Sequence, residues 1–195
     1  MCFLDWRDIT GNYLYVAVST GYIYVYGKNP DGTFAQIAGS PLATRPNPSD
    51  LAFSSDGDFL YVTSAGSTAM GYHTVNSDGS LGAATNINLS GQTTDCVIIG
   101  NIFYTNPAFK KLEAYTIKAD GTFSYPIVSA LNFANDIDSL IVDPAEKHLY
   151  VTNWYTDDIW VLGINTDGTL FQPAGVPYEA GYDEVKAMII VKPVH

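Results

Sequence analysis

Three aspartates stand at similar points of the sequence, each one or two residues before a short apolar run. They are Asp50 in NPSD, Asp95 in TTDC and Asp138 in DIDS. If the apolar runs are strands lining a common axis, the three carboxylates converge at one mouth of it, and oxygen ligands of this kind suit Ca²⁺. The sequence therefore predicts a calcium site formed by these three residues. In the competing interpretation, each aspartate bonds nearby backbone amides.

Two further observations limit the calcium hypothesis. The fourth equivalent region, DEVKAM, brings Lys186 in place of an acid. The segments NSDGS and NTDGT resemble EF-hand loops but lack the spaced acidic ligands and the final glutamate. Calcium is thus the one cofactor that the sequence suggests.

Histidines and arginines are too few to form a recognisable catalytic motif. His148 occupies a position that other segments fill with aromatic rings, and His73 lies inside a predicted strand, so both are expected to pack. His195 is the last residue, and Arg7 and Arg45 belong to predicted turns. A reaction that moves a proton needs a positioned acid or base. No catalytic residue is predicted from these positions.

The composition indicates an all-β protein with few possible partners. Of 195 residues, 47% are hydrophobic and 14 are tyrosine, and the formal charge is −11. Such a charge repels phosphate groups, so nucleic acid and anionic membranes are not expected as partners. No apolar run approaches the length of a membrane span, and MCFLDWRD does not read as a signal peptide. The compartment stays open.

The two cysteines show no metal-binding or disulfide pattern. Cys2 and Cys96 lie far apart, without a second cysteine or a histidine at zinc-ligand spacing. Cys96 opens the apolar run CVII. It is therefore expected to pack as a small core residue.

The chain repeats itself with a period of 42 to 47 residues. An Asp-Gly turn recurs at Asp31, Asp78, Asp120 and Asp167, and each is preceded by two strand-like segments and a short apolar run. Each unit reads as a four-stranded meander, with a type I′ turn at Asp-Gly. The predicted units are 1–49, 50–94, 95–138 and 139–186, followed by an extra inner strand at 187–193. Repeats of this length and strand number are typical of a β-propeller.

Aromatic residues gather in two places. Tyr22, Tyr24 and Tyr26 alternate along one predicted strand, and Trp154, Tyr155 and Trp160 surround a turn. We expect most of them to pack between blades. A surface that binds sugars or proteins is the alternative.

The repeats resemble a known family. LAFSSDGDFLYVTSAG and LIVDPAEKHLYVTNWYTDDIWVLGINTDGTL are similar to the YVTN-type repeats of lactonase-like β-propellers, and AGSPLATRPNPSDLAF resembles their connection between blades. The resemblance implies an all-β propeller of four-stranded antiparallel blades. Family enzymes include a phosphogluconolactonase and a carboxymuconate cyclase, which generally have seven blades, whereas this chain has about four.

The expected function is a binding or assembly module that presents loops on a rigid frame. Its expected partner is a protein or a second copy of the chain, and a small molecule at the axial channel is a further option. The alternative is a diverged lactonase-like hydrolase or cyclase with its site at the channel mouth. Architecture alone does not separate these functions.

Inner strands outnumber the complete sets of outer strands by one. The inner runs are CFL, LAF, CVII, LIV and MIIV. In one alternative, Ile189 to Val191 displace the N-terminal CFLDW segment and close a four-bladed ring. In the other, the chain is a half-ring, and two chains close a larger propeller by exchanging that strand. A bare inner strand exposes unpaired backbone groups, so homo-oligomerisation is expected.

Overall fold

The computed structural model describes residues 4–7, 10–108, 110–133, 136–153, 156–175 and 177–179. Within these ranges the chain forms eighteen β-strands and turns, without a helix. A membrane-spanning helix is accordingly not found among the residues that were placed. The strands form four antiparallel sheets, called blades 1 to 4 in chain order. The predicted all-β propeller fold is confirmed.

The first four strands of each blade form a meander and pair in chain order, whereas β5 pairs with β3 and β18 with β16. Blade 1 contains β1 (Leu4–Arg7), β2 (Tyr13–Val18), β3 (Tyr22–Lys28), β4 (Phe34–Gln36) and β5 (Leu42–Ala43). Blade 2 contains β6 (Pro48–Phe53), β7 (Phe59–Ser64), β8 (Ala69–Thr74) and β9 (Thr85–Asn88). Blade 3 contains β10 (Cys96–Ile99), β11 (Ile102–Thr105), β12 (Lys111–Ile117) and β13 (Phe123–Asn132). Blade 4 contains β14 (Ile137–Val142), β15 (His148–Asn153), β16 (Asp158–Ile164), β17 (Leu170–Phe171) and β18 (Tyr178–Glu179).

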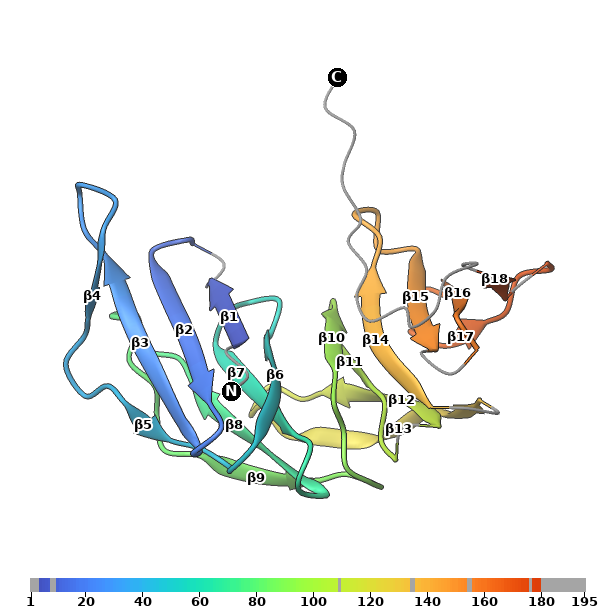
Figure 1. The fold of residues 1–195 in the computed structure, drawn as a ribbon, viewed down its shortest axis with the longest axis horizontal. Helices are drawn as coiled ribbons and strands as arrows, with labels where there is room; N and C mark the ends of the chain where they lie inside the picture. Colours follow the sequence, from blue (N-terminus) through green and yellow to red (C-terminus); the bar gives the residue numbers. More distant parts are fainter. Residues whose placement is uncertain are drawn as a thin grey trace.

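The four blades form an open arc (Figure 1). The innermost strands β1, β6, β10 and β14 line its concave side, and each contacts the next one. Blades 1 and 4 lie at opposite ends of the arc. The described chain is therefore a partial ring of blades.

The hydrophobic core consists of three clusters, one between each pair of successive blades. Alternation along the second strand places Leu60 and Val62 against blade 1 and sends Tyr61 towards blade 3, and all three are fully buried. Both faces of an inner blade are covered. This explains why these strands read as almost unbroken apolar runs.

The Asp-Gly turns differ from the predicted type I′ geometry. In blade 1, Gly32 N donates to Asn29 O at 2.9 Å, and Gly32 has a φ of 86°, whereas Asp31 is not among the residues with positive φ. This is a type I turn followed by a left-handed glycine. Asp31 Oδ1 accepts bonds from the amide and hydroxyl of Thr33, at 2.9 and 2.6 Å. These bonds hold the aspartate in place, so only the glycine takes positive φ.

A tyrosine hydroxyl joins each blade to the Asp-Gly turn of the next. The donor lies on the second strand, and the acceptor is the turn glycine's carbonyl oxygen. The three bonds are Tyr15 Oη to Gly79 O at 2.8 Å, Tyr61 Oη to Gly121 O at 2.9 Å and Tyr104 Oη to Gly168 O at 2.8 Å. Successive blades are thus held together by the same contact three times.

The inner strand of blade 1 comes from the N-terminal segment. Leu4–Arg7 pairs with β2, with Leu4 opposite Ala17, so this strand begins two residues after the start of the predicted CFL run. Because that place is occupied, the displacement of CFLDW required by the closed four-bladed alternative does not occur. The predicted surplus strand, 187–193, lies outside the described residues.

Candidate functional site

Two carboxyl groups meet between the inner strands of blades 2 and 3. Asp50 lies in β6, and its Oδ1 accepts the Leu51 amide at 2.8 Å. Its Oδ2 accepts the amide of Cys96, the first residue of β10, at 3.0 Å. Asp95 immediately precedes β10, and its side chain is hydrogen-bonded to that of Asp50. We call Asp50 and Asp95 the carboxyl pair.

Asp95 repeats the same contact one blade further along. Its Oδ2 accepts the amide of Leu140, in the inner strand β14, at 2.8 Å. Each carboxyl group therefore bonds the backbone of the next blade's inner strand. This agrees with the competing sequence interpretation, in which aspartates bond backbone amides, although the amides belong to a neighbouring blade.

Burial and mutual contact shift the pKa values of both members of the carboxyl pair. Burial raises the pKa of Asp50 well above its usual range, and the negative charge of Asp95 raises it further. Burial also raises the pKa of Asp95, while the hydrogen bond from Asp50 lowers it. Asp50 is therefore the member of the pair with the greater tendency to keep its proton. Neither residue is fully buried.

A buried polar network holds the turn that carries Asp95. Asn106 Oδ1 accepts the amides of Thr94 and Asp95 at 3.1 and 3.0 Å. Asn106 Nδ2 donates to Thr94 Oγ1 at 2.7 Å and to the backbone oxygen of Ile137 at 3.1 Å. Because Asn106 is fully buried and uses both ends of its amide, the position of Asp95 is well defined.

The third predicted calcium ligand stands one residue out of register. Leu51 lies opposite Val62 in blade 2, and Leu140 lies opposite Val151 in blade 4, so Ser139 is the counterpart of Asp50. Ser139 bonds Asp95, while Asp138 corresponds to Ser49. Among the residues described, no three His, Cys, Asp or Glu side chains are grouped to hold a metal ion.

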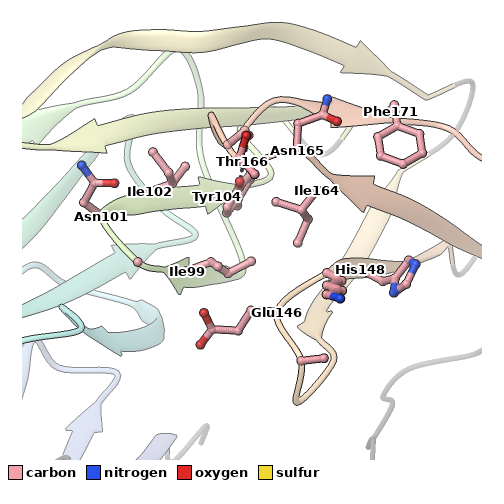
Figure 2. A pocket seen from close by; sticks show the side chains of 14 residues that line it. Ile99, Asn101, Ile102, Tyr104, Glu146, His148, Ile164, Asn165, Thr166 and Phe171 are labelled. Atoms are coloured by element: carbon pink, nitrogen blue, oxygen red, sulfur yellow. Dashed lines mark hydrogen bonds between the residues drawn. The ribbon is translucent and has the colours of Figure 1, made fainter.

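A second candidate site is a pocket of about 610 Å³ between blades 3 and 4 (Figure 2). It opens beside the Asp-Gly turn, at the ends of the inner strands remote from the carboxyl pair. Ile102, Tyr104, Ile164 and Phe171 form its apolar walls, and His148 lies at its edge.

A gap recurs at each interface between successive blades, and this pocket is the largest of the three gaps. Smaller pockets of about 340 and 350 Å³ lie at the equivalent places of the two earlier interfaces. There the rings of Tyr13 and Phe59 lie against the turn glycines Gly79 and Gly121. Ile102 takes their position against the next blade, and its smaller side chain leaves more space. The pocket therefore follows from a change in packing.

Three basic residues considered from the sequence, His73, His148 and Arg45, lie close to polar groups of the protein itself. His73 is fully buried, with Nδ1 at 2.9 Å from Gly82 O and Nε2 at 3.1 Å from Thr44 Oγ1, and burial lowers its pKa. His148 Nδ1 lies 3.6 Å from Asp143 Oδ2. The side chain of Arg45 bonds Asn86 and Ser67 of blade 2.

The aromatic groups and cysteines divide between core, surface and undescribed positions. Trp160 packs edge-on against Phe133 with 5.3 Å between ring centres. Tyr22 is 44% exposed, so the tyrosines of β3 are not packed between described blades as expected. Cys96 is buried and free. Cys2, Trp154, Tyr155, Lys186, His195 and the side chain of Arg7 lie outside the description.

One buried acid was not anticipated from the sequence. Glu113, in KLEAYTI of β12, is 2% exposed and contacts Lys111 Nζ and the hydroxyl of Tyr115. Burial and the bond to Glu113 raise the pKa of Tyr115. The alternating pattern of the strand gave no signal, because a glutamate on the alternate face reads as solvent-exposed.

Comparison with known proteins rests on structure alone, since no family model and no curated protein matches the sequence. A candidate 6-phosphogluconolactonase from Bacteroides uniformis superposes with a TM-score of 0.76 at 16% identity, over 88% of this chain and 53% of that one. The Pseudomonas aeruginosa periplasmic gluconolactonase PpgL superposes with a TM-score of 0.72 at 14% identity, over 93% and 58%. The chain has a lactonase-like β-propeller fold.

This propeller spans 53% and 58% of the lengths of these two proteins. A functionally unknown protein from Desulfotomaculum acetoxidans shows the same relation, with a TM-score of 0.78 at 15% identity, over 97% of this chain and 61% of that one. At such identities the likeness concerns the fold. Activity must be argued from the propeller's own residues.

Proposed function

We propose that this propeller hydrolyses an uncharged lactone at the carboxyl pair. The observation that carries the proposal is the contact of the Asp50 and Asp95 side chains between successive inner strands, where one carboxyl group serves as the acid and the other as the base. Pairs of this kind perform acid and base steps in one cycle. The fold likeness to candidate lactonases supports this hydrolase interpretation over the non-catalytic module expected from the sequence.

The two carboxyl groups account for each proton in the reaction. Asp95 takes a proton from water as the water oxygen attacks the lactone carbonyl carbon. Asp50 gives its proton to the ring oxygen as the carbon–oxygen bond breaks, so one water and one lactone yield one hydroxy acid. The proton on Asp95 then returns to Asp50 along their shared hydrogen bond. The pair is restored without a cofactor.

The charge of the molecule selects the substrate class. A formal charge of −11 repels anions, and the side chains that bond the pair and its turn are hydroxyls, an amide and the Cys96 thiol, all of them uncharged. We therefore expect neutral sugar lactones to be preferred over phosphorylated ones.

Lactone hydrolysis in the parent protein and two variants tests the proposal. Asp95→Asn removes the base and should lower kcat/KM for a neutral aldonolactone by about 10²- to 10⁴-fold. Asp138→Asn is the matched control, because this aspartate lies one position out of register, and it should leave kcat/KM unchanged. The assay is release of acid at constant pH, with folding checked by circular dichroism. A parent protein that hydrolyses no lactone above the buffer rate would overturn the proposal.

A further inference from the structure

The two ends of the arc present the two halves of the interface that successive blades form inside the chain. We call the face of a blade turned towards the next blade its donor face, because it carries the bonding tyrosine. The face turned towards the preceding blade is its acceptor face, at the end of which lies the Asp-Gly turn. Blades 1 to 3 use their donor faces, and blades 2 to 4 use their acceptor faces.

The acceptor face of blade 1 is apolar and incompletely covered. Leu60 and Val62 of blade 2 and Leu149 and Val151 of blade 4 are fully buried on this face, whereas their counterparts Leu14 and Val16 of blade 1 are only half-buried. The paired tyrosines of β3 extend the same surface: Tyr26 opposite Leu14, Tyr24 opposite Val16 and Tyr22 opposite Val18. Leucine, valine and tyrosine side chains at a sheet face favour a covering layer.

The Asp-Gly turn of blade 1 is open in the same way. A Cβ placed on Gly79 or Gly121 would strike an aromatic ring of the preceding blade, and one on Gly168 would strike Ile102. A Cβ on Gly32 would meet nothing within 4 Å. The Asp-Gly turn of blade 1 therefore resembles the turns that accept a tyrosine hydrogen bond, but among the described residues no side chain of a preceding blade lies against it.

The donor face of blade 4 is the complementary surface. Tyr150 takes the place of Tyr15, Tyr61 and Tyr104, yet it is half-buried and its hydroxyl has no hydrogen bond among the described residues. Ile159 and Val161 are half-buried, whereas their counterparts Ile23 and Val25 are 0% and 2% exposed. This face has the tyrosine and the apolar residues of an interior interface.

We propose that the donor face of blade 4 docks on the acceptor face of blade 1 of a second copy, and that two copies close an eight-bladed ring. Tyr150 then donates to the Gly32 carbonyl of the other copy, and the ring of His148 covers that turn as Tyr13 covers Gly79. A second copy is the fitting occupant because it carries the matching half of an interface already present three times in the chain. Two such contacts related by a two-fold axis leave neither end open.

The mass in solution is the first test, and it is independent of any lactonase activity. Sedimentation of the parent protein over roughly 1 μM to 1 mM should show twice the mass of one chain at the upper concentrations. A single-chain mass throughout would overturn the proposal. A mass that kept growing beyond two chains would show that the two copies do not close a ring.

Mixing two variants separates head-to-tail docking from other dimers. Val16→Asp spoils the acceptor face, and Val161→Asp spoils the donor face. Each variant alone should be a single chain, because every contact needs one face of each kind. An equimolar mixture should recover a two-chain species through its one intact contact. A Val161→Asp protein that stays a dimer alone, or a mixture that fails to associate while both variants are folded by near-ultraviolet circular dichroism, would overturn the arrangement.

Milder variants keep the test decisive if the charged ones unfold. Tyr150→Phe should weaken association about three- to tenfold and leave the single chain's stability unchanged. Tyr61→Phe, which removes the same bond inside the chain, should lower stability and leave association unchanged. Gly32→Ala should weaken association more than Gly39→Ala, whose φ is also positive and whose surroundings are also open. Equal effects of the paired variants on association would contradict the proposal.

Discussion

At the scale of single residues, the carboxyl pair combines a structural task with the chemical one that we propose. Asp50 and Asp95 each accept a backbone amide from the next blade, so they help to hold successive inner strands together. The same crowding places two acids side by side away from full solvation, which favours one retained proton. The acid and base of the proposed reaction are therefore a consequence of how the blades are joined.

The retained proton should be visible in the pH dependence of stability. The pKa of Asp50 is raised on folding, so the folded state binds more protons than the unfolded one above about pH 4. Stability should fall as the pH rises from there through the folded pKa, and then level off. Asp50→Asn, whose amide imitates the protonated acid, should flatten this fall, measured by urea unfolding at several pH values.

An exposed aspartate provides the control for that series. Hydrogen bonds from Thr33 lower the pKa of Asp31, so its contribution has the opposite sign and is lost as the pH falls. Asp31→Asn should leave the decline above pH 4 in place. If the stability of Asp50→Asn fell with rising pH as steeply as that of the parent protein, a group other than Asp50 would be responsible for the fall.

At the scale of elements, the Asp-Gly turn works as a joint between blades as well as a hairpin. Its glycine carbonyl accepts the tyrosine of the preceding blade, and its left-handed glycine admits an aromatic ring where a Cβ would stand. At Gly121 such a Cβ would lie 2.7 Å from atoms of Phe59 and Tyr72. Glycine is thus required there both for its φ of 80° and for its missing side chain.

Alanine substitution separates these two requirements. Gly39→Ala meets open space, so it should cost only the strain of positive φ, about 1 kcal/mol. Gly121→Ala adds overpacking and should cost about 2 to 4 kcal/mol in total. Urea unfolding of both variants measures the difference. Equal losses of stability in Gly39→Ala and Gly121→Ala would show that the rings of Phe59 and Tyr72 move aside at no energetic cost.

At the scale of the whole molecule, the described arc of blades has an incompletely covered apolar face at each end, on a strongly acidic chain. Two copies with a formal charge of −11 each repel one another, while burial of the end faces favours association. The balance between these opposing contributions depends on ionic strength.

Salt should therefore strengthen the association. Raising the ionic strength from about 0.01 M to about 1 M shortens the screening length from about 30 Å to about 3 Å and removes most of the repulsion. The midpoint concentration for pairing, measured by sedimentation, should fall across this range. The midpoint for Tyr150→Phe should fall with salt in the same way, but lie at higher protein concentrations throughout. Weaker association in salt would point to an interface dominated by opposite charges.

The sequence by itself determined the class of fold and the composition of the blades. Periodic apolar runs and Asp-Gly turns act over a few residues, so LYVT segments could be recognised as strands and the recurring meander as a propeller. The finer geometry of the turns was predicted wrongly, because the side chain of Asp31 binds Thr33 and leaves positive φ to Gly32 alone.

Only the tertiary structure decided the partners of the site residues and the state of the two ends. Asp50 bonds the amide of Cys96, 46 positions away, and a contact over that distance leaves no local pattern in the sequence. Strand register placed Ser139, and not Asp138, at the position that corresponds to Asp50, although the three aspartates look equivalent in the sequence. Among the described residues, the Tyr150 hydroxyl has no hydrogen bond and the space beside Gly32 is empty, because the packing of one blade on another sets where an arc of four blades ends.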